Sequence, residues 1–203
     1  MPHELYLAFL LVCFIAVLIP GPTATLIIAN SLAHGTRAGL LNVAGTQLGL
    51  AVMIGIVAIG LASVIEILGT WFDWIRLAGA AYLIWIGWKM VRSAGAVDAS
   101  GRAPTPRGGF FLQGFLVALS NPKMLLYFGA LIPQFIDPAG DYLSQILLLG
   151  LTSMVFAVFS DGLYAMLSGR AGRVLSQKRV RLISRIGGGF LIGGGIWLAL
   201  QRR

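Results

Sequence analysis

The chain has 203 residues, of which 58% are hydrophobic and 11% charged, and its mean hydropathy is +0.87. A soluble globular domain has about a quarter charged residues, so this composition excludes an ordinary soluble domain and indicates an integral membrane protein. The net charge of +8 does not indicate a nucleic-acid-binding protein, because the basic residues lie between apolar segments, where they orient membrane helices.

Six apolar segments are long enough to cross a bilayer, since a span needs about 20 residues. The first begins near Glu4 without a preceding Lys or Arg, so we interpret it as a retained span and not as a cleaved signal peptide. The runs are continuous and do not alternate with polar residues, which favours helices over strands. We predict an all-α membrane protein with six transmembrane helices, over residues 5–33, 38–68, 71–91, 109–133, 143–168 and 182–200.

The first segment contains Pro20, Gly21 and Pro22 and is 29 residues long. A straight helix of that length would measure about 43 Å, against a hydrocarbon core of about 30 Å. Proline removes N–H donors, and the carbonyls left without partners need protein or water at this depth. We predict a broken helix whose second half, from Thr23, directs free N–H groups at the break as a site for a carboxylate. A plain proline kink is the alternative.

The second segment carries three polar side chains, Asn42, Thr46 and Gln47. Asn42 and Thr46 are four residues apart and therefore share a helix face. They either line a substrate cavity or form hydrogen bonds between helices, and the sequence favours neither.

Small and aromatic residues in the spans predict packing more than binding. Glycines spaced four apart allow helices to approach closely. We expect this of Gly45 with Gly49 and of Gly189 with Gly193. The aromatic residues of the third span belong to the core or to the interfacial belt; they are Tyr82, Trp85 and Trp88.

A stretch rich in Gly, Ala, Ser and Pro, residues 93–108, predicts a flexible cytoplasmic linker inside one transmembrane domain, 1–203. It divides the chain into a first three-helix repeat, 1–92, and a second, 109–203. Because three is an odd number, the second repeat enters the membrane with inverted orientation. The prediction is therefore two inverted repeats, the architecture of many secondary transporters.

The fourth segment supports this division, because it contains Asn121 and Pro122 followed by Lys123, at a depth similar to that of the first break. Pro122 aligns with Pro22, and Asn121 aligns with Gly21. Two broken helices in corresponding positions of the two halves are the usual sequence indication of a transporter's binding site.

Two ionisable residues lie inside predicted spans, Lys123 in the fourth and Asp161 in the fifth. Charges at such depth are energetically costly and usually functional. Lys123 either binds a substrate carboxylate or pairs with Asp161. Asp161 is the candidate for proton coupling, and its alternative is to extend toward the cytoplasmic end of its helix.

Lys and Arg are distributed unevenly between the two sides. The connections after spans 1, 3 and 5 hold eleven of them, and the opposite side holds three. The positive-inside rule places the eleven in the cytoplasm and both termini in the periplasm. Arg202 and Arg203 at the C-terminus fit this orientation less well, and a cytoplasmic C-terminus would require one span fewer or more.

No metal site, cofactor or catalytic centre is predicted. Cys13 is a single cysteine and is expected to pack as a small apolar residue. His3 and His34 lie near the ends of the first span, too few to hold a metal alone and far along the chain from any nucleophile. No phosphate-binding Gly-rich motif or zinc-protease motif is present.

The motifs PGP in span 1, GTRAG before span 2, YLIWIGWKM in span 3 and NPK with LIPQFIDP in span 4 resemble the LysE family of amino-acid exporters, in its RhtB (homoserine/threonine efflux) branch. The resemblance covers nearly the whole chain. It implies a six-span exporter of the bacterial inner membrane that uses the proton gradient, forms a homodimer and has an acidic residue at Asp161. Thr23 departs from the Asn of many relatives. The resemblance assigns importance to Pro20, Gly21, Pro22, Asn121, Pro122 and Lys123.

We therefore predict a secondary exporter of an amino acid or similar zwitterion, whose substrate is a small molecule and whose surroundings are the lipid bilayer. The predicted substrate-binding residues are Pro20, Gly21, Pro22, Thr23, Asn42, Thr46, Gln47, Asn121, Pro122 and Lys123, with Asp161 for the proton. One alternative is an exporter of a metal or inorganic ion on a similar frame, which would need soft or acidic ligands. The other is a membrane scaffold that transports nothing and has no solute-accessible cavity.

Overall fold

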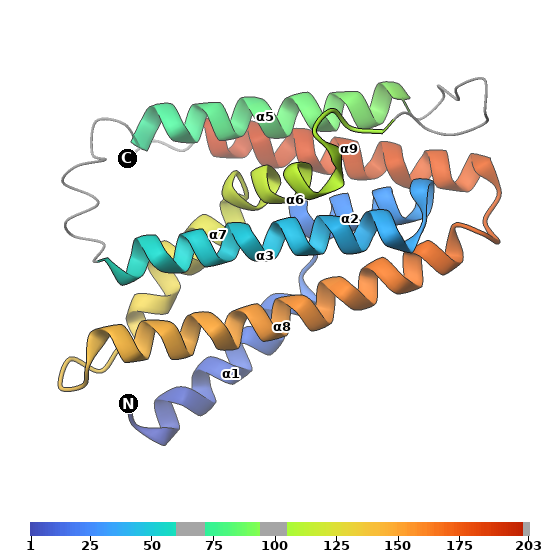
Figure 1. The fold of residues 1–203 in the computed structure, drawn as a ribbon. Coiled ribbons are helices and arrows are strands. Elements are labelled where there is room, and N and C mark those ends of the chain that lie inside the picture. Colours follow the sequence, from blue (N-terminus) through green and yellow to red (C-terminus); the bar gives the residue numbers. More distant parts are fainter. Residues whose placement is uncertain (60–71, 94–104, 201–203) are drawn as a thin grey trace.

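The structure, a computed structural model, describes residues 1–59, 72–93 and 105–200, and these form helices without any strand. The helices run roughly along one axis, and both α1 and α9 have their outer ends at the left of Figure 1. Their bounds are α1 His3–Leu18, α2 Pro22–His34, α3 Thr36–Ala58, α5 Phe72–Ser93, α6 Gly109–Leu119, α7 Pro122–Leu126, a π-helical turn Tyr127–Leu131, a 3-10 turn Ile132–Phe135, α8 Tyr142–Ala171 and α9 Gln177–Leu200.

Three of these helices, α3, α8 and α9, are long and apolar enough to cross a membrane, and the number rises to five if each of two bent pairs is one span. The bent pairs are α1 with α2, at 46°, and α6 with the segment from Pro122 to Phe135, at 48°. Helix α5 follows most of the predicted third span but is not among the candidates. The predicted second span, 38–68, extends past residue 59 and in part lies outside the described residues.

Close contacts between helices occur where one helix presents glycine. A Cβ at Gly45 would overlap the backbone of Phe111 in α6, and one at Gly49 would lie 2.8 Å from Cβ of Ala118. This pair therefore packs, as predicted. The pair Gly189 and Gly193 does not pack in this way: among the residues that the structure describes, nothing lies within 4 Å of either Cβ position.

Two other glycines of α9 pack against α5, and they lie on a different face of the helix from Gly189 and Gly193. A Cβ at Gly188 would lie 2.6 Å from the carbonyl oxygen of Gly87, and one at Gly195 would lie 2.8 Å from that of Ala80. The prediction for Gly189 and Gly193 was wrong because Gly188 and Gly195, the glycines that contact α5, are seven residues apart and share another face of the helix. The spacing of four therefore did not identify the packed face, and the tertiary contacts did.

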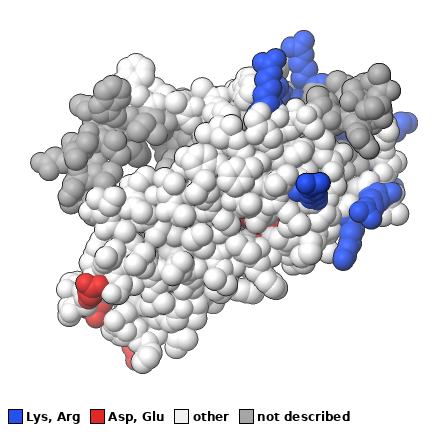
Figure 2. Space-filling view, in the orientation of Figure 1, with Lys and Arg blue, Asp and Glu red and all other residues white. Residues whose placement is uncertain are grey.

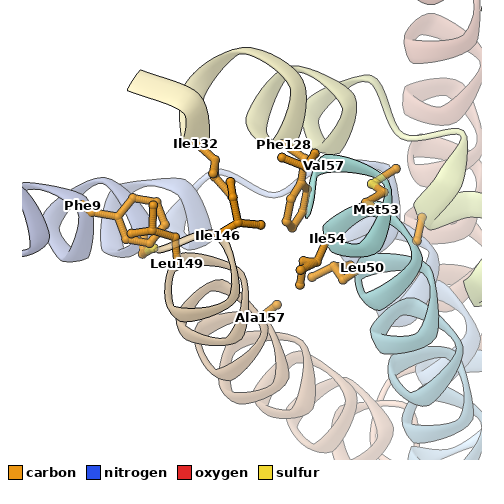
Figure 3. Packing of buried hydrophobic residues seen from close by; sticks show 12 residues of the cluster. Phe9, Leu50, Met53, Ile54, Val57, Phe128, Ile132, Ile146, Leu149 and Ala157 are labelled. Carbon is orange, nitrogen blue, oxygen red and sulfur yellow. The ribbon is translucent and has the colours of Figure 1, made fainter. Parts of the chain in front are cut away.

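The main apolar core joins the two halves of the chain. Phe9 from α1 lies beside Leu149 of α8, while Phe128 and Ile132 approach from the turns after α7 (Figure 3). All four side chains are at most 3% exposed. In a bilayer the gain from such contacts is mainly van der Waals packing, since lipid tails are as apolar as the side chains.

The outer surface is apolar along the helices and charged at the ends. Large exposed side chains such as Leu151, Val155 and Phe159 of α8 suit contact with lipid. Figure 2 shows Lys and Arg gathered at the right end, where α2 meets α3 and α8 leads to α9, while acidic residues appear at the left end. We name the right end the basic end.

Helix α8 begins at a side-chain cap outside the apolar region. An Asp141 carboxylate oxygen accepts hydrogen bonds from the Ser144 hydroxyl and from the Ser144 backbone N–H, the latter at 2.8 Å. These bonds lower the pKa of the Asp141 carboxyl. Gln145 fixes the preceding loop, because its amide oxygen accepts from the Asp137 N–H at 2.8 Å and its amide nitrogen donates to the Asp137 carbonyl at 3.0 Å.

Candidate functional site

The first helix break leaves backbone carbonyls without their usual donors. Helix α1 ends at Leu18 and α2 begins at Pro22. The carbonyl of Ala16 would accept from the N–H of residue 20, but residue 20 is proline and has none. Ile19 has extended backbone angles, so its carbonyl also leaves the helical pattern. Such groups need partners at membrane depth.

Lys123 supplies those partners from the other half of the chain. Its ammonium nitrogen donates to the carbonyl oxygens of Ala16 and Ile19, at 2.5 and 2.6 Å. A positive charge at a helix C-terminus also complements the helix dipole. In the described part of the chain no ion pair within 4 Å joins Lys123 to Asp161, so the lysine here caps α1 while staying within electrostatic reach of the acid.

The second break is capped by Asn121, which is fully buried. Its side-chain oxygen accepts from the Lys123 backbone N–H at 3.0 Å and thereby begins α7. Its amide nitrogen donates to the Thr23 hydroxyl at 3.1 Å. Asn121 therefore links the second break to the first residue of α2 beyond the PGP motif.

A cavity of about 50 Å³ lies beside both breaks, and we name it the central cavity. Roughly 3 or 4 waters fit in such a volume, so an amino acid requires the cavity to widen. Helices α1, α2, α3 and α8 contribute to its wall, as do α7 and the π-helical turn. The polar or close-approaching residues in the wall include Gly21, Thr23, Lys123, Tyr127, Ser153 and Asp161.

Two backbone donors of α2 belong to the wall. The first hydrogen bond of the helix runs from the Thr25 N–H to the Gly21 carbonyl, at 3.0 Å. The N–H groups of Thr23 and Ala24 precede it and have no partner within the helix. Both residues line the central cavity. Free N–H groups at the positive end of a helix dipole bind carboxylates.

Asp161 contributes the negative charge of the cavity. Its side chain is 7% exposed, and no hydrogen bond to it is found among the described residues. Lys123 is the positive group that acts on it electrostatically. An isolated carboxylate is costly to bury, so Asp161 depends on the neighbouring cation, on a proton or on a bound cationic group.

A chain of three polar side chains completes one wall, and none of the three is among the predicted site residues. The Ser153 hydroxyl donates to the Leu149 carbonyl at 2.8 Å, so it accepts from the Tyr127 hydroxyl at 3.0 Å. Tyr127 then accepts from the Cys13 thiol at 3.0 Å. Cys13 is thus a weak donor in a polar chain and not merely an apolar filler.

One signal for this wall was available in the sequence. Ser153, Ala157 and Asp161 are spaced four residues apart and therefore lie on one face of α8. The sequence around Tyr127 did not indicate that this side chain lines the cavity. Tyr127 lies in a π-helical turn; such turns are frequent at functional sites but have no sequence pattern that predicts them.

The three polar residues of the second predicted span are not in the wall of the central cavity. Asn42 is fully buried and accepts a hydrogen bond from the Asn30 amide at 2.8 Å, while it donates to the Phe110 carbonyl at 2.6 Å. The Thr46 hydroxyl and the Gln47 amide are buried without a hydrogen-bond partner in the described part of the chain. Asn42 therefore forms hydrogen bonds between helices, which is one of the two roles predicted for it.

The prolines of both breaks are not among the described residues that line the central cavity. Together with α9 they line an open apolar groove of about 770 Å³, and Pro20, Pro22 and Pro122 belong to it. Gly21 and Lys123 face both this groove and the central cavity. The structure therefore brings Gly21, Thr23, Lys123 and Asp161 to one cavity, with Asn121 directly behind Thr23.

Comparisons with known proteins find a family and relatives that match most of the chain. A family model described as LysE type translocator matches residues 14–202. The homoserine/homoserine lactone efflux protein of Salmonella typhimurium is 35% identical over 204 residues, which cover 100% of this chain and 99% of the relative. The leucine efflux protein of Klebsiella pneumoniae is 32% identical over 137 residues, which cover 65% of this chain and 63% of the relative. No solved structure matches the chain.

Proposed function

The chain belongs to the LysE type translocator family, and from this premise we propose that it is a secondary exporter of an amino acid or a related small zwitterion across the bacterial inner membrane, driven by proton exchange. It is a transporter and not an enzyme. The relatives named above carry homoserine or leucine in their names, which makes these two amino acids the first substrates to test.

The proposal rests on the presence of two opposite charges, Lys123 and Asp161, in the wall of one cavity beside the two helix breaks. The free N–H groups of Thr23 and Ala24, together with the Lys123 ammonium, suit a carboxylate. The buried carboxylate of Asp161 suits an ammonium group or a proton. An α-amino acid carries both of these charges.

We propose the following cycle for these groups. A substrate carboxylate that binds at Thr23 competes with the carbonyls of Ala16 and Ile19 for the Lys123 ammonium. Release of those carbonyls frees the end of α1 to move relative to α7. Protonation of Asp161 from the outer side then expels the substrate's ammonium group, and loss of that proton to the cytoplasm resets the carrier.

We also propose the number of spans, their arrangement in repeats and their orientation in the membrane. Six spans in two inverted repeats, 1–92 and 109–203 joined by 93–108, would place the basic end in the cytoplasm and both termini in the periplasm. The separation of charges in Figure 2 supports this orientation. A homodimer completes the proposal, and cross-linking in membranes tests it.

The decisive experiment is the substitution Asp161→Asn in proteoliposomes loaded with labelled homoserine or leucine. We expect gradient-driven export to be lost while the protein remains folded, because an amide neither releases a proton nor binds an ammonium group strongly. The matched control is Glu4→Gln, which neutralises an exposed acid and should export normally. Unchanged gradient-driven export by the Asp161 variant would overturn the proton-coupled mechanism.

A further inference from the structure

A second cavity lies at the basic end, separate from the central cavity and not used in the cycle above. Its volume is about 140 Å³, and we name it the basic-end cavity. It lies between the C-terminal halves of α2 and α5 and the start of α6. Six of its lining residues matter here: Asn30, Tyr82, Trp85, Lys89, Arg107 and Gln113.

The charge of this cavity is positive. Arg107 and Lys89 line it, and no acidic side chain is among its described lining residues. Guanidinium groups bind carboxylates through paired, charge-assisted hydrogen bonds. The surrounding surface is basic as well (Figure 2), so an anionic group is drawn to this end before it meets the cavity.

One wall is aromatic. The rings of Tyr82 and Trp85 lie with their centroids 5.9 Å apart, and the Lys89 ammonium lies 4.6 Å from the centroid of Trp85. A lysine held over an aromatic face keeps its charge beside an apolar surface. This combination suits a ligand with a carboxylate next to an aliphatic side chain.

A network of side-chain amides borders this cavity. The Asn30 amide nitrogen donates to Gln113 at 3.0 Å and to Asn42 at 2.8 Å, which joins α2, α6 and α3. Leu26 and Ile27, which lie between Thr23 and Asn30 along α2, are fully buried. From Thr23 to Asn30 is seven residues along α2, or about 10 Å.

We propose that the basic-end cavity is a loading site, at which an amino acid from the cytoplasm binds before it reaches the central cavity. Arg107 and Lys89 bind the carboxylate, Trp85 and Tyr82 cover the side chain, and the Gln113 amide oxygen accepts from the ammonium group. Passage inward then requires the Asn30 hydrogen bonds to Asn42 and Gln113 to open. This inference rests on the proposed export function and on its orientation.

Intrinsic tryptophan fluorescence of the full-length protein in vesicles tests the site directly. Leucine and homoserine should change the emission saturably, whereas leucinol, which lacks the carboxylate, should not. The signal should vanish in Trp85→Phe and persist in Trp88→Phe.

Arg107→Gln should weaken the apparent affinity about tenfold, as expected for loss of one charge-assisted contact. Arg173→Gln removes an exposed arginine outside the cavity and should change nothing.

A second measurement does not depend on fluorescence. Ser184 lines the same cavity, so Ser184→Cys in a Cys13→Ser background should react with a thiol reagent that does not cross the membrane, applied to the cytoplasmic face. Leucine or homoserine should slow this reaction, and leucinol should not.

The outcomes separate this inference from the proposed function. Export of an amino acid without the Trp85 signal and without protection at Ser184 would overturn the loading site and leave the exporter standing. Equal affinities in the Arg107 and Arg173 variants would also overturn it. Saturable, carboxylate-dependent binding in vesicles that export neither amino acid would support the site and contradict the proposed function.

Discussion

The two helix breaks begin from similar motifs and reach stable structures by different means. Pro22 begins α2 after Gly21, and Pro122 begins α7 after Asn121, with bends of 46° and 48°. At the second break Asn121 supplies a side-chain cap within its own motif. At the first break Gly21 has no side chain, so it leaves the first N–H groups of α2 without a side-chain cap. The carbonyls at the end of α1 accept instead from a lysine 107 and 104 positions away.

This difference shows that the first break depends on the second. Lys123 reaches the end of α1, and Asn121 reaches Thr23 at the start of α2. The reverse is not seen: the cap on α7 is made within residues 121–123. The second motif therefore holds the first in place, and changes in it should affect both breaks.

The largest effect should come from Lys123→Met, which leaves the carbonyls of Ala16 and Ile19 unpaired and the Asp161 carboxylate without its cation. We expect destabilisation of about 3 kcal/mol, or an apparent Tm lower by roughly 6–12 °C for a chain of this size. Thermal unfolding in detergent measures it. Lys178→Met, at an exposed lysine, is the matched control. A Tm equal to that of the control would mean that the lysine does not cap α1.

Asn121→Ala should be next, because it removes the α7 cap and the bond to Thr23 and leaves a small void. We expect a loss of about 2 kcal/mol, read as an apparent Tm shift in the same assay. If the first break depends on the second, a cysteine placed at Thr23 should also become more reactive in this variant. Unchanged thiol reactivity there would indicate that the two breaks are independent.

A double-mutant cycle isolates the link between the two breaks. Thr23→Val removes the acceptor and leaves the Asn121 amide unpaired, at a cost of about 1 kcal/mol. Combined with Asn121→Ala, the two effects should fall short of additive by about 1 kcal/mol. Full additivity in chemical or thermal unfolding would show that the bond contributes nothing to stability.

The smallest effect should come from Gly21→Ala. Its φ of −108° is open to any residue, so strain does not decide the result. The added Cβ would lie 3.2 Å from Cδ of Lys123 and 3.7 Å from the Asn121 amide nitrogen. Because the flexible Lys123 side chain can shift, we expect the free energy of unfolding to fall by only about 0.5–1 kcal/mol. Export should also become slower. An unchanged Tm together with an unchanged export rate would show that this contact accommodates a methyl group.

Much of the site followed from single residues whose chemistry is costly in a membrane. Charges at Lys123 and Asp161 and the prolines of the two motifs stand out in apolar segments because burying them requires a reason. The structure brings Gly21, Thr23, Lys123 and Asp161 to one cavity. Asn30 and Gln113 are also polar residues in predicted apolar spans, so the sequence held a weaker signal for them as well.

Contacts between distant segments were not predictable in the same way. The sequence left open whether Lys123 would bind a carboxylate or pair with Asp161, and in the structure it caps α1 instead. Asn42 fits either a cavity or a network on pattern alone, and only its distance to Asn30 distinguishes them. For Gly189 and Gly193 the spacing indicated packing, but the rotation of α9 turned these glycines outward.

Composition and the number of apolar residues in a row were sufficient to predict a helical membrane protein, and the motifs were sufficient to indicate the family that it resembles. Three features could not be predicted in this way: which donor satisfies which carbonyl, which face of α9 packs against α5, and the presence of two cavities along α2. Each of them depends on the rotation and distance of helices far apart in the chain.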